Sequence, residues 1–331
     1  MSNALSRSER ALDLALRQAT FIIFGAVLLY FGLQAPLFLG VDNLGNIVKN
    51  SAFIGIAAIG MTFVLLTRGI DLSVGSVMYL APLLAGFAMR DLGGGVAMGL
   101  LVTLAAGAVL GAINAFFIVR LGIVPFIVTL ASLFAFRGFG AWLTSSRQFD
   151  FAPALRSFGL SSYLGVPVPI IAFAIVILAA HLVLTRTMFG RQVYAFGNDP
   201  DGAVKAGISK ARVQASVYVI SGAAAGLGGF ILIAQIGRID AGFGQGREFD
   251  VIAAAVLGGV SLFGGVGTTL GAVIGATLIQ TVTTGLAFTG VNLYLQPIIQ
   301  AVIIFLAVLL DSVRQHLQQV KRRRVIRPAP N

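Results

Sequence analysis

Apolar runs recur along this chain at close to membrane-crossing length, and short polar segments separate them. A helix needs about 20 residues to cross the hydrocarbon core of a bilayer. Several runs reach that length, whereas the third, eighth and ninth are shorter or rich in glycine. The pattern predicts an all-α integral membrane protein with about ten transmembrane helices, over residues 21–39, 48–67, 74–90, 95–119, 123–143, 167–185, 213–236, 249–263, 266–287 and 294–312.

The longest polar interruption spans residues 186–212, between two apolar blocks. Asp199 can cap the free amides at a helix start, and Pro200 suits the first helical position. Asp201 suits the positive end of the helix dipole, and Gly207 suits a helix end. We therefore expect a short, solvent-facing helix here, by which another protein moves the rest of the chain.

The composition supports the membrane assignment. The 331 residues are 57% hydrophobic and 11% charged, with a mean hydropathy of +0.94. Soluble domains carry roughly 25% charged residues, so too few remain here to cover a surface in water. Cysteine is absent, and the two histidines, His181 and His316, lie far apart in sequence. These counts argue against a thiolate centre or a His-built metal site.

The distribution of basic residues along the chain is typical of a membrane protein and not of a protein that binds nucleic acid. The net charge is +11, but the basic side chains sit in short loops between apolar runs. With a cytoplasmic N-terminus, cytoplasmic segments hold 16 basic residues and outside loops hold 6, while acidic residues divide evenly. This bias predicts cytoplasmic termini, with an N-terminal segment at 1–20, a transmembrane domain at 21–312 and a basic tail at 313–331. We expect the tail to meet anionic membrane lipid.

Two outside loops are long enough to meet a partner: residues 144–166, where short surface helices are expected, and the glycine-rich residues 237–250. Internal similarity is weak. Residues 69–75 align with residues 259–265, and both segments fall at cytoplasmic turns. Such a match fits a duplicated transporter, although short stretches rich in glycine and valine also match by chance.

The turn over residues 60–77 offers the first candidate for function. Asp71 or Ser73 can cap the helix that follows, and the glycines permit a tight turn. The turn is either a structural elbow, with an Arg68–Asp71 charge pair at the membrane edge, or a gate on a transport pathway. The second glycine-rich stretch, residues 253–271, has no nearby lysine and no phosphate-binding loop motif. Close helix packing is the expected role of its small residues.

A third set comprises polar residues within the predicted spans: Asn114, Arg137, Gln235, Gln280 and Gln300. Such groups usually face the interior of a helix bundle. Arg137 lies toward an outer end, where its side chain can reach the interface, and Asn114 is expected to hydrogen-bond between helices. No acidic residue lies at mid-span, and no catalytic cluster is evident. These observations weigh against a proton-driven transporter and a membrane enzyme.

Together, several motifs resemble the permease subunits of bacterial ABC sugar importers, within the ribose and branched-chain amino acid permease superfamily. The similarity covers roughly residues 51–311 and also includes Asn114 and Arg137-Gly138. The motifs are Gly60-Met61-Thr62, Gly69–Ser76, Gly190-Arg191, Tyr194-Ala195, Gly197, Gly207-Ile208, Glu248–Ala254, Gly258-Gly259 and Gly264–Gly267. The chain departs from relatives at Arg68, where glycine is common, at Gly202-Ala203, where a pair of alanines is usual, and at Lys205.

The resemblance implies the ABC importer permease fold, a path without catalytic, cofactor or metal residues, and a location in the bacterial inner membrane. It implies cytoplasmic ATPase subunits, a periplasmic sugar-binding protein and a second permease copy, identical or related. It assigns ATPase coupling to Asn198, Asp199, Pro200, Asp201, Gly202, Ala203, Val204, Lys205, Ala206 and Gly207. Asp71, Asn114 and Arg137 are the candidates for a pathway or gate. The alternative is a secondary transporter or facilitator without an ATPase, and the sequence does not name the sugar.

Overall fold

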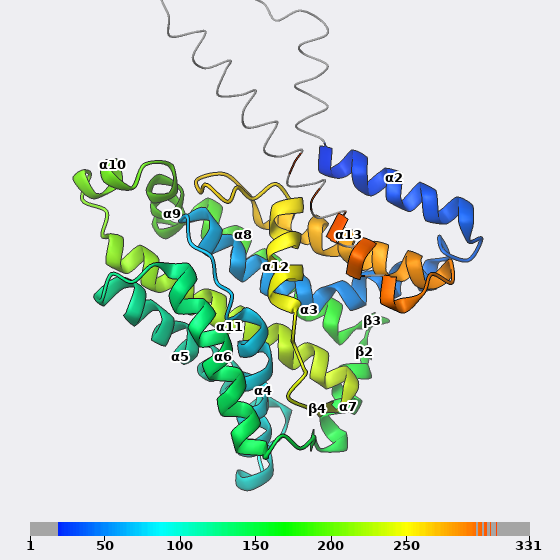
Figure 1. Ribbon diagram of the computed structural model, residues 1–331. Helices are drawn as coiled ribbons and strands as arrows, with labels where there is room; N and C mark the ends of the chain where they lie inside the picture. Colours follow the sequence, from blue (N-terminus) through cyan, green and yellow to red (C-terminus); the bar gives the residue numbers. More distant parts are fainter. Residues whose placement is uncertain (1–18, 296, 300, 303–304, 306–308, 310–331) are drawn as a thin grey trace, which may run out of the picture. The chain divides into compact units, whose positions relative to one another are not determined.

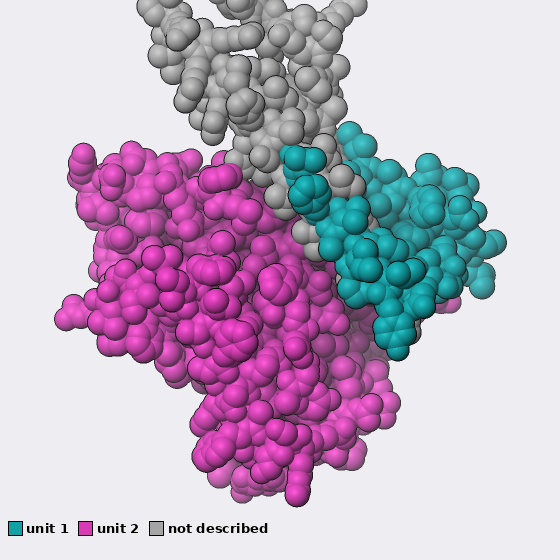
Figure 2. All heavy atoms as spheres, in the orientation of Figure 1, with its two compact units in different colours: residues 1–40, 281–331 teal, residues 41–280 magenta. Residues whose placement is uncertain are grey.

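The computed structural model describes residues 19–295, 297–299, 301–302, 305 and 309, and these form two compact units (Figures 1 and 2). Unit 2 comprises residues 41–280, and unit 1 combines residues up to 40 with those from 281 onward. Within the described residues, six helices are long and apolar enough to cross a membrane. The prediction of an all-α membrane protein therefore holds, while the predicted N-terminal segment to Gln18 and the basic tail lie outside the described residues.

Unit 2 consists mainly of helices joined by short turns (Figure 1). Its longest helices are α3 and α11, and a π-helical turn, η1, continues α5 as far as Arg120. The helices are α3 (Val41–Leu66), α4 (Val74–Leu92), α5 (Val96–Ala115), α6 (Pro125–Thr144), α7 (Pro153–Leu160), α8 (Val168–Arg186), α9 (Met188–Asn198), α10 (Pro200–Lys205), α11 (Lys210–Ile236), α12 (Arg247–Leu257) and α13 (Thr269–Phe288, shared with unit 1).

Helix α11 organises unit 2, since α3, α4, α5 and α7 all pack against it. Its contact with α5 depends on glycine. A Cβ atom at Gly107 would overlap the backbone of Gly222, and one at Gly111 would overlap the carbonyl of Tyr218. Small residues let helix backbones approach closely, which is how helices associate where no water drives them together. The same device joins α12 to α13, where Gly258 meets Gly271. The expected packing role of the second glycine-rich stretch is confirmed.

Short strands connect the loops that were assigned to the outside. Strand β1 (Phe149–Asp150) pairs antiparallel with β4 (Arg238–Ile239), and β2 (Ser162–Tyr163) pairs with β3 (Val166–Pro167). The surface helix expected in residues 144–166 is α7. A buried cluster that includes Phe151, Leu155 and Phe230 lies beneath these loops. The two loops therefore form one packed cap rather than independent flexible arms.

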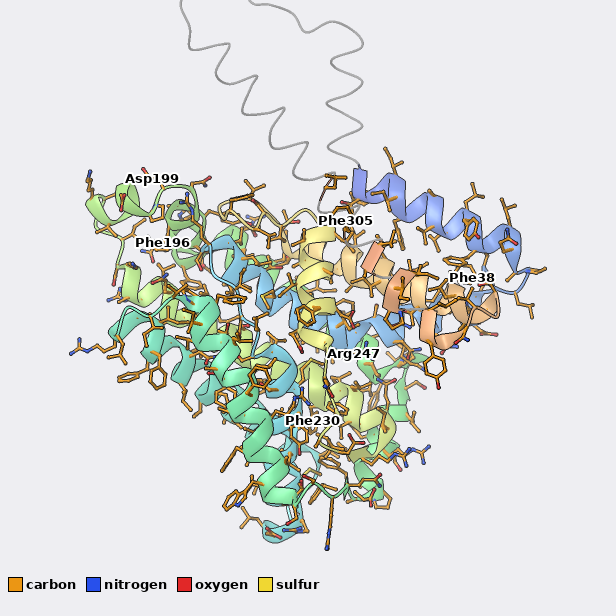
Figure 3. All side chains as sticks on the ribbon, viewed as in Figure 1. Phe38, Phe196, Asp199, Phe230, Arg247 and Phe305 are labelled. Carbon is orange, nitrogen blue, oxygen red and sulfur yellow. The ribbon has the colours of Figure 1, made fainter. Side chains whose placement is uncertain are left out.

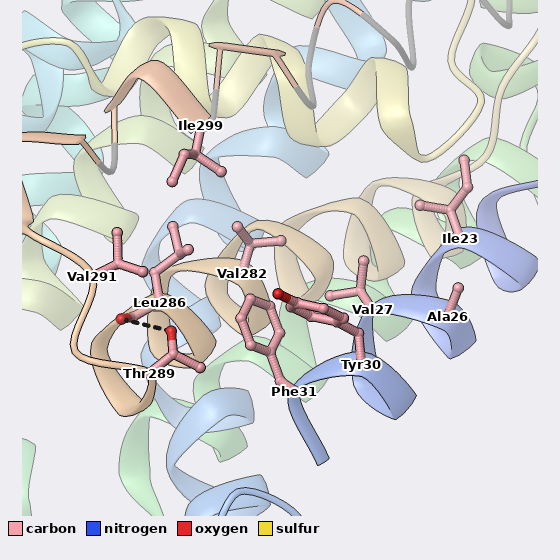
Figure 4. A pocket seen from close by; sticks show the side chains of 10 residues that line it. All are labelled: Ile23, Ala26, Val27, Tyr30, Phe31, Val282, Leu286, Thr289, Val291 and Ile299. Carbon is pink, nitrogen blue, oxygen red and sulfur yellow. Dashed lines mark hydrogen bonds between the residues drawn. The ribbon is translucent and has the colours of Figure 1, made fainter. Parts of the chain in front are cut away.

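Unit 1 holds α2 (Ala19–Gln34), the end of α13 and the 3-10 helix η2 (Leu293–Leu295). Its aromatic residues cluster, with the rings of Phe38 and Phe288 packed edge to face at a centroid distance of 5.7 Å. An open, mostly apolar cavity of about 510 Å³ lies between α2, the end of α13 and the segment that follows it (Figure 4). Its lining side chains include Tyr30 and Thr289.

Several predicted spans differ from the observed helices. The span at 249–263 was wrong as a continuous helix, because α12 ends at Leu257 and a glycine-rich turn follows. Eleven residues rise about 16 Å, roughly half of the hydrocarbon core. Helix α2 is also short, with 16 residues. The span predicted at 294–312 lies largely outside the described residues.

Gly111→Leu should destabilise the protein, because a leucine side chain cannot fit between α5 and the Tyr218 carbonyl. Overpacking of this kind costs about 1–3 kcal/mol. Thermal denaturation in detergent should show a lower midpoint than wild type. Gly138→Leu is the matched control, since nothing lies within 4 Å of a Cβ at Gly138. Equal midpoints for the two variants would contradict the close packing of α5 on α11.

Candidate functional site

The central polar segment folds as two consecutive helices, α9 and α10. Thr187 caps α9 by accepting a hydrogen bond from the Gly190 amide at 3.1 Å, and Asp199 caps α10 through the Gly202 amide, also at 3.1 Å. Gly207, with φ of +83°, ends the second helix in the left-handed conformation that glycine adopts easily. The predicted start and end of a short helix are therefore confirmed.

Helix α10 exposes one side and buries the other. Ala203 is only 6% exposed, whereas Val204 is 50% exposed, and the neighbouring side chains of Asp201, Lys205 and Ala206 are exposed as well. An apolar side chain so exposed at the tip of a polar segment is available for a partner (Figure 3 labels the nearby Phe196 and Asp199). Ala203, in contrast, belongs to the internal packing of the chain.

Helix α9, which the sequence reasoning did not distinguish, anchors α10 to the rest of unit 2. Val193 and Phe196 are buried. The Phe189 ring stacks on Phe63 of α3 at 6.4 Å, and the Tyr194 hydroxyl donates to the Gly267 carbonyl at 2.7 Å. Its buried positions recur at helical spacing, and this periodicity was the signal that could have revealed it.

Arg68 joins the end of α9 to the turn after α3. Its Nε donates to the carbonyl of Gly197, and its Nη2 donates to that of Asn198, each at 2.8 Å. The carbonyls at a helix C-terminus lack partners within the helix and carry partial negative charge, so a guanidinium suits them. Arg68 itself has φ of +64°. This is the left-handed region, which a side chain with a Cβ adopts rarely, and the two hydrogen bonds offset that strain.

Three backbone segments meet directly beneath Arg68. The amide of Gly265 donates to the carbonyl of Leu66 at 2.9 Å. A Cβ at Gly197 would overlap the same carbonyl, and one at Gly265 would press on Asn198. The turn after α3, the end of α9 and the turn after α12 therefore fit together without space between them. We call this contact the Arg68 junction, formed by Leu66, Arg68, Gly197, Asn198, Gly264 and Gly265.

A buried polar network begins three residues after Arg68. Ser132 of α6 donates to Asn114 of α5 at 2.6 Å, and Asn114 donates to the Ser73 hydroxyl at 2.8 Å. Ser73 in turn donates to Asp71 at 2.6 Å, and Ser221 of α11 donates to the other carboxylate oxygen at 2.8 Å. The donors all point toward Asp71, so each bond polarises the next. This network ties four parts of unit 2 together.

Two of the candidate gate residues, Asp71 and Asn114, therefore meet in one network. The expected hydrogen bonding of Asn114 between helices is confirmed. Asp71 is 1% exposed, and burial raises the pKa of its carboxyl, while hydrogen bonds from Ser73 and Ser221 lower it. The Arg68–Asp71 charge pair of the elbow interpretation does not form, because each side chain bonds elsewhere. Neither Asp71 nor Ser73 caps α4 through a side-chain hydrogen bond.

Arg137, the third candidate, lies apart from this network. Its Nη1 donates to the carbonyls of Ala241 and Phe243, at 2.7 and 3.0 Å, in the loop before α12. Its guanidinium carbon lies 5.9 Å from the centre of the Tyr79 ring. Sequence reasoning did not single out Tyr79, Ser221 or Glu248 as site residues. Glu248 begins the motif Glu248–Ala254, but no local pattern distinguishes Tyr79 or Ser221 from ordinary helix positions.

Comparison with known proteins gives consistent matches along the chain. Residues 43–308 match the family described as "Branched-chain amino acid transport system / permease component". The ribose import permease protein RbsC of Escherichia coli K12 is 37% identical over 290 residues, covering 85% of this chain and 89% of that protein. The xylose transport system permease protein XylH of the same strain is 31% identical, covering 87% and 89%. No solved structure matches.

Removing the Arg68 guanidinium should loosen α9 and α10. In Arg68→Gly the backbone strain disappears together with both hydrogen bonds, so the helix-end carbonyls lose their partner. Because the side chain is exposed, losing its hydrogen bonds lowers the free energy of local opening by about 1 kcal/mol, which corresponds to about fivefold faster amide exchange. Hydrogen–deuterium exchange of the full chain in nanodiscs should show the increase within residues 188–206. Arg120→Gly, at the end of η1, is the control, and unchanged exchange in Arg68→Gly would contradict the junction.

Proposed function

Because the chain belongs to the family of branched-chain amino acid transport permease components, we propose that it is the transmembrane permease subunit of an ATP-driven ABC importer for a monosaccharide. The observation that carries the proposal is the similarity to ribose and xylose permeases over more than four-fifths of the chain. The chain then forms the path itself, and hydrolysis of ATP takes place on a separate subunit. It needs no catalytic residue, cofactor or metal of its own.

The proposal assigns the remaining parts of the transporter to other proteins. The transporter has two cytoplasmic ATPase subunits, and α10 is where an ATPase subunit binds this chain. A periplasmic sugar-binding protein meets the packed cap of outside loops. A second permease copy, identical or related, completes the path. The exposed face of α10 supports the first contact, because Val204 presents an apolar side chain to solvent. Packed strands in the outside loops support the second, because they give a binding protein a shaped surface.

We further propose that movement passes from α10 through the Arg68 junction to the Asp71 network. ATP-driven closure of the ATPase pair displaces α10, and α9 moves with it. The Arg68 guanidinium and the glycine backbones pass the displacement to the turn after α3, since no space remains between them. That turn carries Asp71, whose hydrogen bonds reach α11 directly and α5 and α6 through Ser73. Tightly packed elements shift between discrete arrangements, as a gate requires.

We propose ten membrane crossings with both termini in the cytoplasm of a bacterial inner-membrane protein. The six long helices account for six crossings, and α2, α4, α12 with its turn, and residues 294–312 supply the other four. Non-helical backbone at membrane depth is tolerated where protein covers it, as it covers Val260 after α12. The bias of basic residues toward one side supports the orientation.

Single cysteines test this orientation in the naturally cysteine-free chain. Ser157→Cys on α7 should react with an impermeant thiol reagent in intact cells, whereas Ala206→Cys at the end of α10 should react only after permeabilisation. Both positions are exposed. Ala206 is a better reporter than Ser209, whose side chain caps α11. The opposite labelling pattern would overturn the topology and, with it, the cytoplasmic role of α10.

Val204→Asp tests the docking of α10 on the ATPase. A carboxylate forced against an apolar groove costs about 1–3 kcal/mol, so ATPase co-purification and sugar uptake should both fall by about tenfold or more. Labelled ribose and xylose are the first sugars to measure. Val166→Asp, an equally simple change at an exposed valine in the outside loop, should leave co-purification at the wild-type level. Normal ATPase association in Val204→Asp, with normal expression, would refute the docking role.

A further inference from the structure

Three buried polar atoms near the outside loops have no hydrogen-bond partner among the described residues: the Tyr79 hydroxyl, Arg137 Nη2 and Glu248 Oε2. Tyr79 is 0% exposed and Glu248 is 6% exposed, while Arg137 is partly buried. The Thr144 side chain interacts with the Tyr79 hydroxyl, but the two groups form no hydrogen bond of ordinary length. Buried polar atoms in native proteins almost always have partners, so three together call for an explanation.

The surrounding contacts hold these side chains in place but leave the three atoms free. The hydrogen bonds from Arg137 Nη1 to Ala241 and Phe243 fix the guanidinium over the Tyr79 ring. The Glu248 carboxylate lies against the backbone of Gly75, where any Cβ atom would overlap it. The charges of Arg137 and Glu248 influence each other, yet no direct ion pair joins these two residues. Arg137 Nη2, a donor, and Glu248 Oε2, an acceptor, therefore lie in the same region without forming a hydrogen bond to each other.

We propose that Tyr79, Arg137 and Glu248 form a binding site for the hydroxyl groups of a neutral sugar during its passage. This inference rests on the proposed function and adds the residues that recognise the substrate. A hydroxyl group accepts from a guanidinium and donates to a carboxylate at the same time, so adjacent sugar hydroxyls satisfy both side chains. The Tyr79 hydroxyl adds a third group that donates or accepts.

The charges of the site favour a neutral, hydroxyl-rich ligand over other classes. Glu248 repels an anion, and Arg137 repels a cation. An apolar ligand would leave all three polar atoms without partners, which is a strong ground for rejection. Water molecules also form hydrogen bonds with these three atoms, but a site that holds only water does not distinguish sugars by the arrangement of their hydroxyl groups. Selectivity among sugars therefore separates a ligand site from a hydrated one.

The segment that covers this site is in direct contact with it. Gly237, Gly244 and Gly246 all have positive φ, and the turn they border packs against Gly75 at the start of α4. Arg137 binds the carbonyls of that same turn, so a ligand that engages Arg137 also acts on the covering segment. In the proposed topology this turn faces outside, where a binding protein releases its sugar.

The test uses the intact transporter in proteoliposomes, with its ATPase and binding protein and with ribose, xylose and their monodeoxy analogues as probes. Wild type should import at least one parent sugar and discriminate against an analogue that lacks one hydroxyl. Glu248→Gln and Arg137→Lys should reduce maximal import of the parent by about tenfold or more. They should also reduce discrimination against that analogue by fivefold or more relative to wild type, because the hydroxyl has lost its partner. The binding protein is the same throughout, so its own selectivity cancels in this comparison.

Asp42→Asn and Arg120→Lys, at exposed positions outside the loops of the packed cap, are the matched controls, and they should keep both import and discrimination at wild-type levels. Glu248→Gln and Arg137→Lys with wild-type import, or with equal losses for the parent and every analogue, would overturn the site and indicate a hydrated structural cluster. Absence of import by wild type, together with failure to assemble with the ATPase, would instead refute the proposed function and the site with it. Wild-type assembly and parent import with altered discrimination only in the site variants supports both.

Discussion

The burial of the Asp71 carboxylate is the constraint on which the interior of unit 2 depends. A carboxyl group enclosed by apolar helices is tolerated only where hydrogen bonds replace water. Here the replacement comes from α11 directly and from α5 and α6 through Ser73, so these elements must keep their relative positions for the carboxylate to keep its partners. The glycine contact between α5 and α11 allows the helices to approach closely enough for this arrangement.

The features that could be predicted from sequence are those determined by neighbouring residues. Apolar runs predicted the long helices, because a helix that crosses the bilayer needs about 20 consecutive, mostly apolar residues. Asp199, Pro200 and Gly207 predicted both ends of α10, because capping involves residues only a few positions apart. The turn before α4 was located correctly as well, although capping alone did not show that its carboxylate is buried.

The features that could not be predicted depend on residues distant in sequence. Arg68 bonds carbonyls 129 and 130 positions away, so its local sequence favoured a nearby partner, Asp71, that it does not bind. Helix α12 is short because Gly259 has positive φ, and the turn that follows is held by contacts with α13 and Leu66. Tyr79 carries no pattern of its own, the motif that contains Glu248 does not reveal its neighbours, and only the fold places their polar atoms near those of Arg137.

Asp199 is the only residue between α9 and α10, and it serves as the C-cap of one helix and the N-cap of the other. A connection of one residue leaves little freedom in how the two helices are oriented relative to each other. Successive residues of an α-helix are rotated by about 100°, so one residue inserted here would turn the exposed face of α10 toward a different direction. Surface loops usually tolerate insertions and deletions, but at this joint the number of residues is as important as their identity. Length variation is therefore expected in other turns of the chain, and not between Asn198 and Pro200.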